Sequence, residues 1–158
     1  MERIAAIRSH LGDEWIPTIY RDKVRTQRTR STHIDIPPRQ NLAEIQYTLL
    51  GIELKVGKNR FSCPDLAAAR YIRIFARAGI SDFAIPYDIT KVSVMADELE
   101  TAWQKLLLLV EADSGKLSAG GRTRFRKDAI QLVRLEIAEI GAGGTMPTFD
   151  RETRQRPR

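Results

Sequence analysis

The strongest constraint on the fold is residues 43–63, where apolar and polar side chains alternate almost without a break. Such an alternation is typical of strands that bury one face, because successive side chains of a strand point to opposite sides. Gly51 interrupts the alternation, and Gly57-Lys58-Asn59 has the composition of a tight turn. The segment is therefore predicted to form a meander whose last strand is Arg60 to Cys63.

After the meander, apolar residues recur every three or four positions, which predicts helices over residues 65–78, 91–112 and 123–140. Gly79 ends the first of these helices. A short alternating strand, residues 83–87, separates it from the second helix. The predicted fold is α+β: a small, mostly antiparallel sheet covered by three substantial helices.

The N-terminal part has weaker patterns. Residues 2–11 are predicted to form a short helix, residues 15–20 an edge strand, residues 21–32 a polar loop, and residues 33–36 a brief strand. The sheet is expected to draw its strands from residues 15–63 and 82–87. Residues 1–144 are predicted to form a single globular domain, and residues 145–158 a basic, disordered tail.

Composition indicates an intracellular globular protein. The chain has 158 residues, a size that suits one domain with a real core. No apolar run approaches the roughly 20 residues of a membrane span, so no membrane partner is expected. Cys63 is the only cysteine, which excludes an internal disulfide and favours a cytoplasmic location.

The net charge is +6, from 26 Lys and Arg against 20 Asp and Glu. Basic residues gather toward the two ends of the chain, with an acidic helix between them. Clustered cations gain free energy by releasing counterions from phosphates, so this asymmetry suggests DNA or RNA as a partner. A basic charge that serves only solubility is the alternative.

Two basic segments are candidates for phosphate contact. The first, residues 122–127, joins a glycine-rich loop to the predicted start of the last helix, where free backbone N–H groups favour an anion. The second, residues 21–30, carries five cations in a polar loop, which suits contacts to a nucleic-acid backbone. Alternatively, Asp128 and nearby acidic groups neutralise the cations of residues 122–127, and residues 21–30 are only a solvated loop. The Arg70, Arg73 and Arg77 face is expected to be solvent-facing. The candidate nucleic-acid-binding residues are Arg25, Arg28, Arg30, Arg122, Arg124, Arg126 and Lys127.

A third pattern points to different chemistry. Glu53 and Lys55 share one face of a predicted strand, and Asp35 lies on an earlier strand. With the surrounding order of helices and strands over residues 2–87, this pattern resembles the PD-(D/E)xK nucleases. The resemblance implies Mg²⁺ ligands at Asp35 and Glu53, with Lys55 positioning the attacking water. A cross-strand ion pair of Glu53 is the simpler alternative.

The sequence thus predicts a non-catalytic nucleic-acid-binding protein that contacts phosphates through basic loops. A Mg²⁺-dependent nuclease and a protein–protein adaptor are the alternatives. No cofactor is expected, apart from Mg²⁺ under the nuclease alternative. Trp15 and Trp103 are expected to lie in the core.

Overall fold

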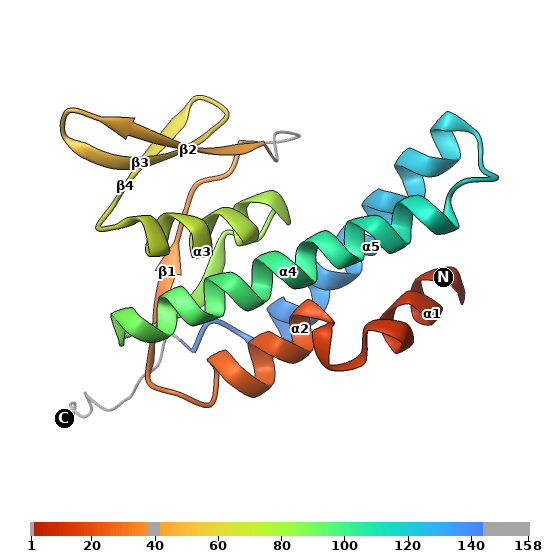
Figure 1. The fold of residues 1–158 in the computed structure, drawn as a ribbon, viewed down its shortest axis with the longest axis horizontal. Helices are drawn as coiled ribbons and strands as arrows, with labels where there is room; N and C mark the ends of the chain where they lie inside the picture. Colours follow the sequence, from red (N-terminus) through yellow and green to blue (C-terminus); the bar gives the residue numbers. More distant parts are fainter. Residues whose placement is uncertain (1, 38–41, 144–158) are drawn as a thin grey trace.

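The computed structural model describes residues 2–37 and 42–143, which form an α+β fold (Figure 1). The predicted fold class and its three substantial helices, α3, α4 and α5, are confirmed. The predicted tail, residues 145–158, lies outside the described residues. The helices are α1 (Glu2–Leu11), α2 (Ile16–Ile19), α3 (Leu66–Arg77), α4 (Ile89–Asp113) and α5 (Ala119–Ile140). The strands are β1 (Thr29–His33), β2 (Ala43–Thr48), β3 (Gly51–Val56), β4 (Asn59–Cys63) and β5 (Asp82–Pro86).

The strands are divided between two antiparallel sheets. One is the predicted meander, in the order β2-β3-β4, with Ile45 opposite Leu54 and Leu54 opposite Phe61. The other pairs β1 with β5, so that Thr29 lies opposite Pro86 and His33 opposite Asp82. Sequence patterns predict which residues form strands but not which strands pair, because pairing depends on contacts between distant segments.

Two N-terminal predictions are wrong. Residues 15–20 form no strand: α2 and the π-helical turn η2 (Tyr20–Val24) occupy this region. Ile16, Ile19 and Tyr20 have helical i, i+3, i+4 spacing, and all three are buried. Residues 21–32 are likewise not one loop, because they begin in η2 and end in β1.

The strand predicted over residues 33–36 is displaced. Its first residue, His33, is the last residue of β1, and Ile34 to Ile36 follow the strand. The backbone N–H of Ile34 still donates to the carbonyl of Ser81, so the chain remains beside the start of β5.

Helix α3 lies between the three-stranded sheet and α4 (Figure 1). Asp65 caps its N-terminus by accepting a hydrogen bond from the Ala68 N–H at 2.8 Å. Leu54 and the residues opposite it on β2 and β4 lie on the face of the sheet that packs against α3. Glu53 and Lys55 lie on the other face.

The arginines of α3 do not form the solvent-facing surface expected from the sequence. Arg70 and Arg73 both donate to Glu100 of α4, at 2.7 and 3.1 Å, and each side chain is about three-quarters buried. Burial alone would raise the pKa of Glu100, but the hydrogen bonds from the two guanidinium groups outweigh burial and lower the pKa. The arginine face therefore joins α3 to α4.

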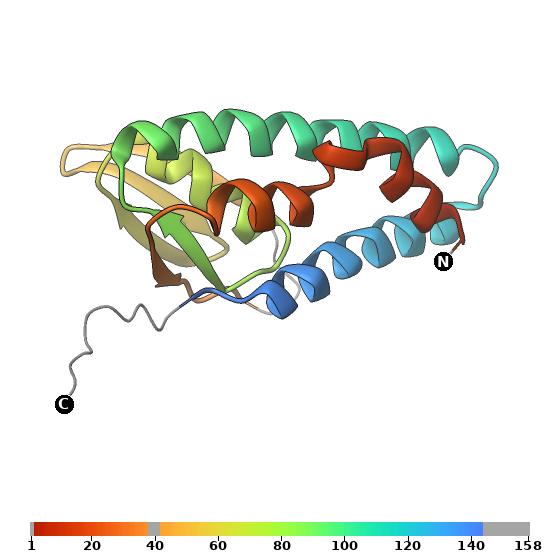
Figure 2. The same cartoon turned by 90° about the horizontal axis from the view of Figure 1, so that it is seen from below.

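The two longest helices frame the rest of the molecule. Helix α4 runs along its length, and α5 returns in the opposite direction, with α1 and α2 beside them (Figure 2). Both tryptophans lie in the core as expected, with Trp15 1% exposed and Trp103 6% exposed. None of the helices in the described part of the chain is long and apolar enough to cross a membrane.

The hydroxyl of Tyr20 connects three parts of the fold. Tyr20 is fully buried, and its oxygen accepts a hydrogen bond from the Ala84 N–H of β5 at 2.8 Å. The same hydroxyl donates to the carbonyl of Gly141, just after α5, at 2.7 Å. One oxygen atom thus ties η2, β5 and the end of α5 together.

Tyr20→Phe is expected to lower the free energy of unfolding by about 1–3 kcal/mol, because the buried N–H of Ala84 loses its acceptor. Urea denaturation followed by circular dichroism measures this change. Tyr87→Phe is the matched control, since Tyr87 is half-exposed, and its effect should stay within about 0.5 kcal/mol. Equal effects of the two substitutions would contradict the structural role of the Tyr20 hydroxyl.

Candidate functional site: a basic groove beside α5

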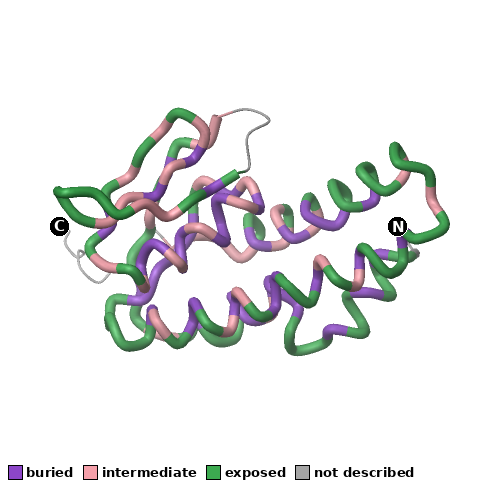
Figure 3. Tube along the Cα trace, turned by 45° about the horizontal axis from the view of Figure 1, so that its top comes forward, coloured by how far each residue is buried: buried purple, intermediate pink, exposed green. Residues whose placement is uncertain are grey.

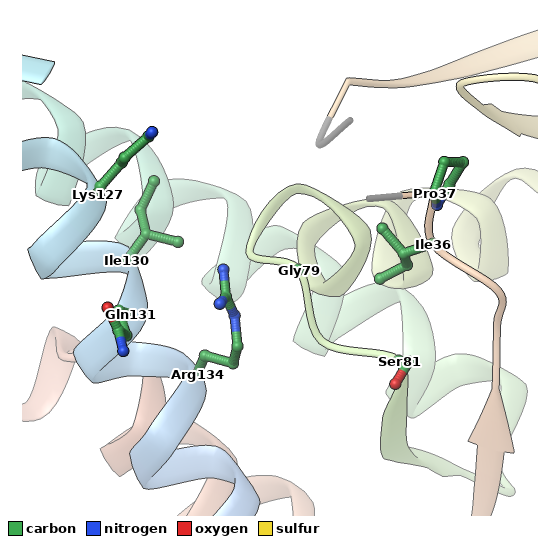
Figure 4. Close-up of a pocket in the computed structure, with 8 residues that line it drawn as sticks. All are labelled: Ile36, Pro37, Gly79, Ser81, Lys127, Ile130, Gln131 and Arg134. Atoms are coloured by element: carbon green, nitrogen blue, oxygen red, sulfur yellow. The ribbon is translucent and has the colours of Figure 1, made fainter. Parts of the chain in front are cut away.

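Two adjoining cavities form a groove between α5 and the chain at the end of α3. Figure 4 shows the residues that line the first of them. Their volumes are about 450 and 460 Å³, and they share Lys127 and Ile130 of α5 as lining residues. We call this feature the basic groove. Its lining residues are Ile36, Pro37, Leu42, Arg77, Gly79, Ser81, Trp103, Leu107, Thr123, Arg126, Lys127, Ile130, Gln131 and Arg134.

The charged side chains that line the basic groove are all cationic. They are Arg77 at the end of α3, and Arg126, Lys127 and Arg134 on α5. Among the described residues, no Asp or Glu lines either cavity. The remaining lining is largely apolar, so the groove has an apolar floor and a cationic margin. Such a surface favours an anionic ligand that also carries apolar area.

Arg134 is held against the end of α3. Its Nε donates to the carbonyl of Ala78 at 3.0 Å, one of the carbonyls that the helix leaves without an internal partner. The adjacent Gly79 has a φ of +76°, and a Cβ there would lie 2.7 Å from Arg134 Nη2. Only glycine therefore suits both the backbone and the guanidinium that crosses it. Figure 4 shows Arg134 reaching from α5 toward Gly79.

Arg77 is fixed at the other end of the basic groove. Its Nη2 donates to the carbonyl of Ala43, at 3.4 Å, where β2 begins. Burial, and after it the charge of Arg73, lowers the pKa of the Arg77 guanidinium. An arginine stays charged at neutral pH under such a shift, so a bound anion would relieve an unfavourable charge.

Arg126 and Lys127 differ from these two, since both are exposed. Neither forms an ion pair with another residue of the described ranges 2–37 and 42–143, and neither does Asp128. Neutralisation of these cations by Asp128, the alternative weighed from the sequence, is therefore not seen. Both side chains are free to meet a ligand.

The predicted start of the last helix was four residues late, which alters the role of residues 122–127. Ser118 caps α5 by accepting from the Gly121 N–H at 3.1 Å, so the basic residues lie within the helix and not at its first free N–H groups. Arg122 donates to the carbonyls of Ser114 and Gly115 after α4, at 3.2 and 3.0 Å. Its guanidinium thus serves the α4–α5 connection, whereas Arg124 is exposed outside the groove lining.

Residues 21–30, the other predicted basic segment, do not converge on the basic groove. Arg25 is half-buried and donates to the hydroxyl of Thr29 at 3.1 Å. Arg28 lies over the ring of Tyr87, with 4.7 Å between the guanidinium carbon and the ring centroid. Arg30 is exposed on β1. Two of these three guanidinium groups are therefore engaged within the protein.

The residues of the nuclease pattern have other partners. Asp35 follows β1, where its carboxylate lies 3.1 Å from His33 Nε2. Glu53 belongs to β3 in the other sheet, and its carboxylate lies 3.6 Å from Arg60 of β4, the cross-strand ion pair considered from the sequence. Lys55 shares the outward face with Glu53 and lies opposite Arg60. Within the described ranges no three His, Cys, Asp or Glu side chains are placed to hold a metal ion.

His33 forms a small polar cluster on the first sheet. Its Nδ1 lies 2.8 Å from the carboxylate of Asp82, and its Nε2 faces Asp35. Hydrogen bonds to Asp82 first, and then to Asp35, raise the pKa of His33 above its ordinary value. The protonated imidazole is therefore favoured by folding.

This raised pKa fixes the sign of a pH effect. Stabilisation by His33 should be complete below roughly pH 6.5, its ordinary pKa, and should be lost as the pH rises through the raised value. Urea titrations at several pH values should show that His33→Gln destabilises the protein at the acidic end and has less effect at the alkaline end. In NMR titrations, Asp82→Asn should lower the pKa of His33. A His33→Gln effect that grows with pH would contradict this assignment.

Comparisons with protein-family models, curated proteins and solved structures found no match for this chain. Function therefore has to be inferred from the groove and the charges that line it.

The sequence pointed to part of the basic groove. Arg126 and Lys127 were candidates, but Arg77 and Arg134 were missed. A signal for Arg134 existed, because it lies seven residues after Lys127 and so shares the same helix face. Arg77 carried no such signal, since only the packing of α3 brings it beside α5.

Proposed function

We propose that the protein binds nucleic acid without cleaving it, through contacts of the basic groove with phosphates. The observation that carries this proposal is the set of four cations lining two adjoining cavities, to which the described part of the chain contributes no acidic residue. Clustered cations of this kind bind a polyanion by displacing its counterions.

The length of the groove favours a polymer over a single small anion. Its lining on α5 extends from Thr123 to Arg134, which is about 16 Å at 1.5 Å per residue. Phosphates along one strand of a duplex recur every ~3.4 Å of helix axis, so several would lie within this length. A single phosphate could engage only one end of the groove.

The cations also differ in how they are held. Arg134 and Arg77 are anchored to backbone carbonyls, whereas Arg126 and Lys127 are exposed and unpaired within the described residues. Arg134 and Arg77 therefore supply positive charge at fixed positions, whereas Arg126 and Lys127 can move to follow the flexible sugar–phosphate backbone of a nucleic acid. This division suits phosphate positioning without base reading.

Binding of labelled single-stranded and duplex oligonucleotides should weaken steeply between low and physiological salt. Arg126→Gln/Lys127→Gln should reduce the slope of log K against log salt by about two, since each lost phosphate contact removes roughly one unit. Fluorescence anisotropy at several salt concentrations provides the slope. The affinity of the variant at low salt should fall at least tenfold.

Lys58→Gln/Lys91→Gln is the matched control, because it removes the same charge from two exposed residues outside the groove. Its salt slope should equal that of the unchanged protein. Equal losses in the two variants would mean that net charge acts alone, and the groove proposal would be abandoned. Cleavage of the oligonucleotides when Mg²⁺ is added would contradict the proposal that the protein binds nucleic acid without cleaving it.

A further inference from the structure

The four most exposed large hydrophobic side chains of the described residues lie within nine positions of one another. They are Leu42, Tyr47, Leu49 and Leu50, which belong to β2 and its flanking residues. Leu49 and Leu50 form the β2–β3 turn and are exposed to essentially their full extent, at 106% and 96%. Figure 3 shows exposed chain at this hairpin. Such a concentration of apolar surface is typical of an interaction site.

Strand β2 is also an edge of the three-stranded sheet. On one side of β2, the backbone groups form hydrogen bonds with β3. On the other side, Arg77 donates a hydrogen bond to the carbonyl of Ala43. Because the direction of these groups alternates along a strand, the N–H and C=O groups of Ile45 and Tyr47 also point away from β3. No other backbone hydrogen bond occupies them in the described residues.

The other edges carry the charges that usually prevent pairing between sheets. Strand β4 bears Arg60 and is followed by Pro64, and β1 bears Arg30 and His33. Between Ala43 and Thr48, β2 contains no Lys, Arg or Pro, and its one charged residue is Glu44. It is therefore the edge least protected against strand addition.

We propose that two copies of this chain pair through β2, antiparallel and about a two-fold axis at Gln46. In this register Ile45 of one copy lies opposite Tyr47 of the other, and about four backbone hydrogen bonds form between them. Leu49 and Leu50 come beside Ala43 and Leu42 of the second copy. The same surface patch of each copy thus contacts its counterpart in the other copy, as a two-fold dimer requires.

Charge supports a second copy as the occupant. The register places Glu44 opposite Thr48, so the two Glu44 carboxylates do not face each other. The four exposed side chains offer on the order of several hundred Å² of accessible surface that pairing would bury in each copy. Together with the strand edge, this approaches the lower end for stable interfaces, ~600 Å² per partner. A reversible dimer that depends on concentration is expected.

Sedimentation velocity over a range of protein concentrations tests the pairing. The unchanged full chain should shift from monomer to dimer as its concentration rises. Gln46→Lys and Gln46→Glu should each raise the dissociation constant at least tenfold, because like charges would meet at the two-fold axis. An equal mixture of the two variants should restore the dimer, since opposite charges then meet there.

Ser62→Lys is the matched control, because it adds a charge to the exposed outer face of β4 at the opposite edge. It should leave the dissociation constant unchanged, and circular dichroism should show that all variants are folded. A chain that stays monomeric at several hundred micromolar would overturn the proposal. So would a dimer that tolerates Gln46→Lys, or a mixture that fails to pair. Leu42 belongs to both surfaces, but Gln46 does not line the basic groove, so the Gln46 variants test the pairing without changing a groove residue.

Discussion

The aromatic contact between α3 and β5 is the interaction on which the remaining arrangement depends. Phe75 stacks on Phe83 with ring centroids 4.3 Å apart, and Tyr71 and Tyr20 pack against Phe75 at 5.0 and 5.7 Å. All four side chains are buried. Because the other side of α3 carries the three-stranded sheet, this contact holds two otherwise separate sheets in one core.

The basic groove is a consequence of how α3 ends. Its last turn brings Ala78 and Gly79 toward α5, and Arg134 crosses them to reach the Ala78 carbonyl. Arg70 and Arg73, on the same face of α3 as Arg77, form ion pairs with Asp97 and Glu100 of α4. None of the four cations that line the groove forms an ion pair with a carboxylate of the described residues. Such a distribution concentrates positive charge in one groove of a protein whose net charge is only +6.

Local patterns predicted much of the fold because local forces decide those parts. The alternation over residues 43–63 placed the meander, and apolar spacing placed α4, whose N-terminus Asp88 caps in the structure. The same approach failed for Trp15 to Tyr20, where a short apolar run fits a strand or a helix equally well. Contacts with the core decided for a helix, since Ile16, Ile19 and Tyr20 must all be buried on one side.

The sequence by itself determined the α+β class, the three long helices, the meander and the net charge of +6. These properties follow from residue spacing, turn residues and composition, which act over a few positions. The tertiary structure alone decided that β1 pairs with β5, that Arg70 and Arg73 bind α4, and that Arg77 and Arg134 meet Lys127 in one groove. Spacing assigns a side chain to a face of its own element. Which distant element covers that face depends on how the whole core packs, and no local pattern records it.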